Sequence, residues 1–108
     1  VAVAPPTNWK YYDSIYTERY LSLPAENPKG YDDNSPVFFA DKLKGKYLLI
    51  HGLTDDNVHF QNSAEMVIAL VKNKKQFDTF YYPNQAHGIS QSRGHLYEMM
   101  TEYFKKNL

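Results

Sequence analysis

The chain contains no cysteine, no excess of either charge and no long apolar run. Without cysteine it can form neither disulfides nor thiolate metal sites, although this absence does not identify a cellular compartment. Lys plus Arg and Asp plus Glu each total 12, so no basic surface is available to bind phosphates. Apolar runs such as Tyr47–Ile50 are far shorter than the roughly 20 residues of a membrane-spanning helix. We therefore expect no nucleic-acid partner and no membrane span in this segment.

Aromatic side chains, by contrast, are abundant. Ten Tyr, six Phe and one Trp account for 16% of the 108 residues, and such side chains commonly line pockets and interfaces. The hydrophobic content of 43% at this length fits one modest globular domain. The chain opens without an initiator Met on the apolar run Val1–Ala4, which predicts a buried strand. We expect the sequence to be a segment of a longer protein.

Four aromatic rings recur at helical spacing near the start of the chain. Trp9, Tyr12, Tyr16 and Tyr20 are three, four and four residues apart, which predicts one helix with an aromatic stripe along one face. Residues 21–35 are rich in Pro, Gly, Asn and Asp, and this composition predicts a surface loop.

The rest of the chain alternates between helix and strand patterns. Hydrophobic periodicity and helix start signals predict helices over 36–43, over 60–73 and after residue 93, with strands over 46–50 and 77–82. Such alternation is typical of the α/β class, in which helices cover both faces of a parallel sheet.

Polar residues follow the ends of two successive predicted strands. Asp55, Asp56 and Asn57 come after the first, and His87 comes after the second. One crossover connects these strands, so the two loops should lie side by side at one edge of the sheet. Enzymes of the α/β hydrolase fold place a triad in the chain order Ser, Asp, His, with the acid and the base on such loops. None of the chain's six serines lies in a G-x-S-x-G motif, so the nucleophile should come from outside these 108 residues.

Each of these features also has a purely structural interpretation. An Asp-Asp-Asn cluster before a helix is often a turn and capping cluster, and an aromatic stripe is often core packing. A single loop histidine is usually solvated. We assign structural roles to His51, His59 and His95. No H-E-x-x-H or His-x-His pattern is present, so we expect no metal.

Three stretches together resemble one enzyme family. Residues 9–20 (WKYYDSIYTERY), 47–61 (YLLIHGLTDDNVHFQ) and 87–89 (HGI) resemble the dipeptidyl peptidase IV group of the prolyl oligopeptidase family of serine peptidases. The resemblance implies a C-terminal portion of an α/β hydrolase, a three-layer αβα arrangement with a short parallel sheet. It also implies that residues 1–108 are one incomplete segment of a catalytic domain. The nucleophile elbow and the propeller domain of the family would lie elsewhere.

The resemblance also implies an activity and a site. The complete enzyme would be a serine-type exopeptidase that releases Xaa-Pro or Xaa-Ala dipeptides from peptide N-termini without a cofactor, and this segment alone would be inactive. Asp55 would be the catalytic acid and His87 the catalytic base. The remaining implied residues bind substrate: Trp9, Tyr12, Tyr16 and Val58 as walls of the proline pocket, and Asn57 as a donor to a substrate carbonyl.

Two further expectations follow from the family, and one alternative stays open. The family implies a homodimer or higher oligomer formed near Phe60, Tyr81 and His95, and a location outside the cytoplasm. The alternative, from a different class, is a non-catalytic interaction module that keeps the α/β hydrolase fold and binds a partner with its aromatic face.

Overall fold

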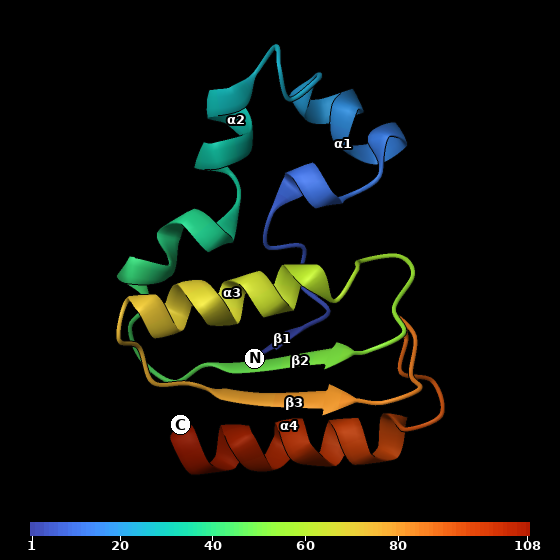
Figure 1. The fold of residues 1–108 in the computed structure, drawn as a ribbon. Helices are drawn as coiled ribbons and strands as arrows, with labels where there is room; N and C mark the ends of the chain where they lie inside the picture. Colours follow the sequence, from blue (N-terminus) through green and yellow to red (C-terminus); the bar gives the residue numbers. More distant parts are fainter.

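A three-stranded parallel sheet forms the middle layer of the computed structural model, which describes all of residues 1–108 (Figure 1). The sheet order is β1 (Ala2–Val3), β2 (Leu48–Gly52), β3 (Asp78–Tyr82), and both pairings are parallel. β2 is the central strand and is buried along its whole length. β1 and β3 are the two edges of this sheet. The parallel pairing confirms the predicted α/β class.

Two helices cover opposite faces of the sheet (Figure 1). α3 (Gln61–Lys72) lies on one face, where Met66 and Leu70 pack with Ala40. α4 (Arg93–Asn107) lies on the other, where Leu96 packs in a core cluster that contains Ile50 from β2. Leu48 and Ile50 of β2 both belong to the cluster under α4, whereas the cluster under α3 is built with side chains of η2 (Pro36–Lys42). The predicted three-layer αβα arrangement is therefore confirmed.

A helical lobe stands above the α3 face and contains four short elements (Figure 1). These are η1 (Trp9–Tyr11), α1 (Ser14–Leu21), α2 (Pro28–Asp33) and η2 (Pro36–Lys42). The prediction of one helix through the aromatic stripe is wrong, because the backbone is extended at Tyr12 and a second helix begins after Asp13. The Asp13 carboxylate accepts a hydrogen bond from the Tyr16 backbone N–H at 2.8 Å and so caps a new helix.

The prediction of a loop over residues 21–35 is also partly wrong. α2 lies inside that range, and the residues taken as breakers start it. The Asn27 side chain accepts a hydrogen bond from the Gly30 backbone N–H at 3.1 Å, and Pro28 occupies the first turn, where its missing N–H is not needed. The predicted short helix after Ser35 forms, but it is a 3₁₀ helix and Ser35 does not cap it through its side chain. None of the helices is both long enough and apolar enough to cross a bilayer.

Candidate active site

The turn after β2 buries a carboxylate in a nest of donors. The Oδ1 atom of Asp55 accepts hydrogen bonds from the backbone N–H groups of Asn57 at 2.9 Å and Val58 at 3.0 Å. The Asp55 side chain has no exposed surface. A buried carboxylate needs its lone pairs satisfied, and this turn supplies two donors within three residues. Asp55 therefore caps its own turn, as the structural interpretation expected, and its second oxygen stays available.

The loop that follows β3 is tied to the end of β2. The backbone N–H of Thr54 donates to the Gln85 carbonyl at 3.1 Å. Gly52 permits this approach, because a Cβ atom there would lie 2.7 Å from the Ala86 carbonyl oxygen. Farther along the loop, Ile89 has a φ of 47° and is only 1% exposed, packed in the core cluster under α4. A β-branched residue rarely adopts that conformation, so core packing holds the loop against local preference.

These two loops bring an acid and a base together. His87 Nδ1 lies 2.8 Å from Asp55 Oδ2, although the residues are 32 positions apart. The carboxylate can only accept, so Nδ1 carries a hydrogen and donates a hydrogen bond to Asp55 Oδ2. The imidazole is 43% exposed, and its Nε2 makes no hydrogen bond within the chain. In the neutral ring Nε2 is then the nitrogen without a hydrogen, and the buried Asp55 side chain fixes the orientation of the imidazole.

The predicted stripe forms an aromatic cluster although the helix beneath it is broken. Trp9 stacks on Tyr16 with ring centroids 5.9 Å apart, and Tyr12 meets both rings edge-on. The Tyr12 hydroxyl donates to Asn57 Oδ1 at 2.8 Å, which joins the cluster to the Asp55 turn. Val58 is buried in that same turn. The sequence-predicted site residues therefore belong to one connected region, next to a cavity of about 430 Å³ that Tyr12 and Asn57 help to line.

Two buried polar residues support this region: Asn62, which the sequence analysis did not single out, and His51, to which it assigned only a structural role. Asn62 at the start of α3 accepts hydrogen bonds from the Thr7 and Asn8 backbone N–H groups at 3.1 and 3.2 Å, which anchors the segment that leads to Trp9. His51 approaches Asp55 Oδ2 at 3.3 Å. The position of His51 in the sequence indicates its burial, because a histidine directly after an apolar strand needs a buried hydrogen-bond partner. His59 is exposed and lines the same cavity as Tyr12 and Asn57, whereas His95 lies on the surface elsewhere.

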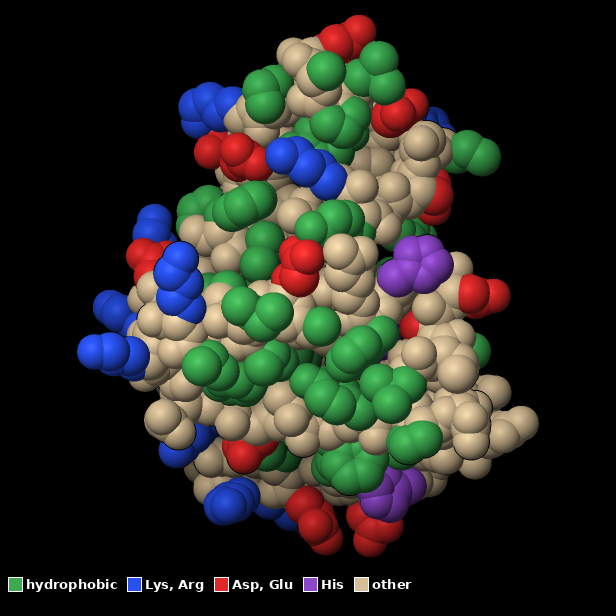
Figure 2. All heavy atoms as spheres, in the orientation of Figure 1, with side chains coloured by type: hydrophobic (Ala, Val, Ile, Leu, Met, Phe, Trp, Pro, Cys, Tyr) green, Lys and Arg blue, Asp and Glu red, His purple; other side chains and the backbone are tan.

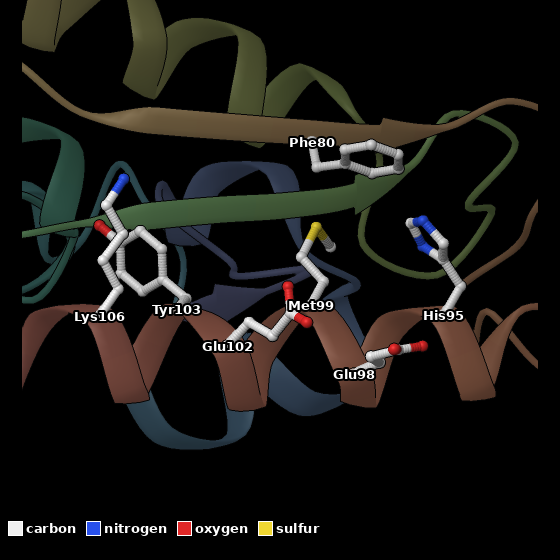
Figure 3. A pocket seen from close by; sticks show the side chains of 7 residues that line it. All are labelled: Phe80, His95, Glu98, Met99, Glu102, Tyr103 and Lys106. Carbon is white, nitrogen blue, oxygen red and sulfur yellow. The ribbon is translucent and has the colours of Figure 1, made fainter.

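A second cavity lies elsewhere, between β3 and α4. It measures about 470 Å³, and Figure 3 shows the side chains around it: Phe80, His95, Glu98, Met99, Glu102, Tyr103 and Lys106. No residue of the Asp55 or His87 loops lines it. No group of three or more His, Asp or Glu side chains in the structure is arranged to hold a metal ion.

Comparison with known protein families matches residues 1–108, the whole chain, to the prolyl oligopeptidase family. The chain belongs to this family. Among curated relatives, it is 46% identical over 114 residues to dipeptidyl peptidase family member 2 of Caenorhabditis elegans, and 46% identical over 110 residues to bovine prolyl endopeptidase FAP. These matches cover 100% and 98% of the chain but only 14% of each relative. The chain thus corresponds to a small part of other prolyl oligopeptidase family members.

Solved structures of similar proteins have the same fold. The Porphyromonas gingivalis dipeptidyl peptidase 4 structure superposes with a TM-score of 0.96 at 40% identity, covering 99% of this chain and 16% of that one. A putative dipeptidyl aminopeptidase IV from Bacteroides ovatus gives the same TM-score at 38% identity, covering 99% and 15%. The αβα unit described above is therefore part of the α/β hydrolase fold of the prolyl oligopeptidase family.

Proposed function

We propose that this chain supplies the acid and the base of the Ser-His-Asp triad in a serine-type dipeptidyl peptidase. The main support for this proposal is the 2.8 Å hydrogen bond between His87 Nδ1 and Asp55 Oδ2. A serine from outside the 108 residues would lose its proton to His87 Nε2 as it attacks the peptide carbonyl. Asp55 would hold the ring in the required tautomer and stabilise the imidazolium. An interaction module, the alternative function, has no need for an exposed imidazole oriented by a buried carboxylate.

The aromatic cluster suits a flat, apolar ring at the second position of the substrate. Tyr16 is 50% exposed, so its ring is accessible beside Trp9 and Tyr12. Proline and alanine at that position would pack against these rings, while Val58, only 4% exposed, would offer them little surface. Asn57 uses its side-chain oxygen to accept a hydrogen bond from the Tyr12 hydroxyl. The side-chain NH₂ group of Asn57 can therefore donate to a substrate carbonyl. We propose release of Xaa-Pro or Xaa-Ala dipeptides on this basis.

The matched pair Asp55→Asn and Asp56→Asn tests the assignment in the complete enzyme. Both substitutions remove one charge from the same turn, but only Asp55 accepts from His87. We expect Asp55→Asn and His87→Ala each to lower kcat by roughly 10³-fold or more on Gly-Pro anilide substrates, while Asp56→Asn costs less than about tenfold. Equal losses at Asp55 and Asp56 would contradict the assignment of the acid.

We further propose that the enzyme dimerises through the face around β3. Figure 2 shows hydrophobic side chains gathered over β3, between α3 and α4. Phe60 and Tyr81 meet edge-on at 4.9 Å, and Ile68 on α3 and Tyr97 on α4 are 65% and 60% exposed. β3 is also an edge strand, so its outer N–H and C=O groups have no partner in this sheet. An exposed apolar patch along an open edge fits a second copy of the same surface.

Light scattering of the complete enzyme tests this interface. The double variant Phe60→Glu, Tyr81→Glu places two charges in the patch and should halve the measured mass at micromolar concentration. Ile15→Glu is the matched control, because Ile15 is 90% exposed on α1, away from the patch. An unchanged mass in the double variant, or an equal loss in the control, would contradict the proposal.

A further inference from the structure

The imidazole of His51 is fully buried at the end of β2 and belongs to neither the Asp55–His87 pair nor the aromatic cluster. Its Nδ1 lies 2.6 Å from Ser63 Oγ on α3, and its Nε2 lies 2.7 Å from the Val58 carbonyl oxygen. The same Nε2 is 3.3 Å from Asp55 Oδ2, the oxygen that accepts from His87. One buried ring therefore contacts the turn that carries the acid at two points.

The partners of His51 determine its tautomer. A carbonyl oxygen can only accept, so Nε2 carries a hydrogen and donates a hydrogen bond to the Val58 carbonyl. Nδ1 of the neutral ring then accepts from the Ser63 hydroxyl. This arrangement places the positive end of the Nε2–H bond beside the Asp55 carboxylate, where no exposed surface admits water to weaken the attraction.

The contacts of Val58 close a small ring of interactions around the acid. Its backbone N–H donates to Asp55 Oδ1 at 3.0 Å, and its backbone carbonyl accepts from His51. The Asp55 carboxylate cannot turn without breaking the first bond, and Val58 cannot follow it without breaking the second. Taking Asp55 and His87 as the proposed catalytic pair, we infer that His51 is a positioning residue for Asp55. It holds Oδ2 in line with His87 Nδ1.

The order of side chains Ser63, His51 and Asp55 resembles a second triad, but its burial excludes that role. Ser63 and His51 are 0% exposed, and so is the Asp55 side chain, so no substrate can reach the hydroxyl. A hydrophobic side chain of similar size would fill this space without the cost of burying a polar ring. The specific contribution of His51 is therefore its donor at the Nε2 position.

Two amide substitutions in the complete enzyme separate that donor from the bulk of the ring. The side-chain NH₂ of His51→Gln reaches the position of Nε2, whereas that of His51→Asn reaches only the position of Nδ1. We expect His51→Gln to keep kcat within about fivefold and His51→Asn to lower it by roughly 30–100-fold, the scale of a misplaced catalytic group. KM should change less than about threefold in both variants, because Val58 is the only proposed substrate-binding residue to which His51 is hydrogen-bonded, and that bond is to its backbone.

Repeating His51→Asn in an Asp55→Asn background tests whether His51 acts through Asp55. A positioning residue has nothing left to position there, so kcat should fall by no further factor. An equal loss in both backgrounds, or equal kcat for His51→Gln and His51→Asn, would overturn the inference. So would failure of both variants to fold, since the contact would then serve the fold alone. Full turnover of Asp55→Asn by itself would instead overturn the proposed function.

Discussion

At the scale of single residues, Gly52 sets how closely the Asp55 and His87 loops approach. A Cβ atom there would meet the backbone carbonyls of Gln85 and Ala86, which cannot move aside as a side chain can. We expect Gly52→Ala to lower kcat of the complete enzyme by roughly 10²-fold, because a shift of about 1 Å in a catalytic group has that effect. Gly94→Ala is the control, since a Cβ at Gly94 meets nothing within 4 Å. Equal kinetics in the two variants would mean that the loops tolerate separation.

Tyr16 allows the pocket and core interpretations of the aromatic cluster to be separated. Its ring contacts Trp9 and Tyr12 and is still 50% exposed, whereas Tyr20 contacts Tyr16 from the outer end and is 65% exposed. We expect Tyr16→Ala to lower kcat/KM for proline substrates by about 1–3 kcal/mol of transition-state binding, and Tyr20→Ala to lower it far less. Lower thermal stability with unchanged kinetics of the folded enzyme would favour core packing.

At the scale of elements, Asn62 joins the helical lobe to the start of α3. It is 1% exposed and accepts from two successive backbone N–H groups, those of Thr7 and Asn8. Asn62→Ala leaves both backbone N–H groups without an acceptor. We therefore expect the free energy of unfolding, measured by urea titration, to fall by about 2–4 kcal/mol. Asn73→Ala is matched, because Asn73 makes one bond at the exposed end of α3, and it should cost less than about 0.5 kcal/mol. Equal losses would contradict an anchoring role.

The elements also show which features could be predicted from sequence. Hydrophobic period placed α3, α4 and the two longer strands within a few residues, because their burial follows from local pattern. Parallel topology then predicted that Asp55 and His87 would meet. The break between η1 and α1 was not predicted. The helical spacing of the aromatic rings indicated one continuous helix, and the only opposing signal was the capping carboxylate of Asp13. The contacts of His51 and Asn62 could not be predicted, since each depends on how distant elements pack.

At the scale of the whole molecule, tyrosines whose pKa is raised by burial occur in the helical lobe, in the sheet and in α4. Burial raises the pKa of Tyr31 in α2, and the nearby Glu18 carboxylate adds to this effect. Burial likewise raises the pKa of Tyr82 in β3 and, with a smaller contribution from Asp78, that of Tyr103 in α4. Three separate parts of the fold therefore contain a buried neutral phenol. We expect ionisation of these phenols to lower the free energy of unfolding of the whole structure.

This distribution predicts an alkaline limit to stability. Unfolded tyrosine ionises near pH 10, whereas the buried phenols of the folded chain retain their protons to higher pH. The folded state then binds more protons, so the free energy of unfolding falls as pH rises above about 10 and is unaffected by these groups below it. Urea midpoints measured between about pH 8 and pH 11 should stay level and then drop. Tyr31→Phe keeps the buried ring and removes the proton, although it also loses the bond from the hydroxyl to the Ser22 carbonyl. It should be less stable at pH 8 but show a shallower drop, and a drop of unchanged steepness would contradict the assignment.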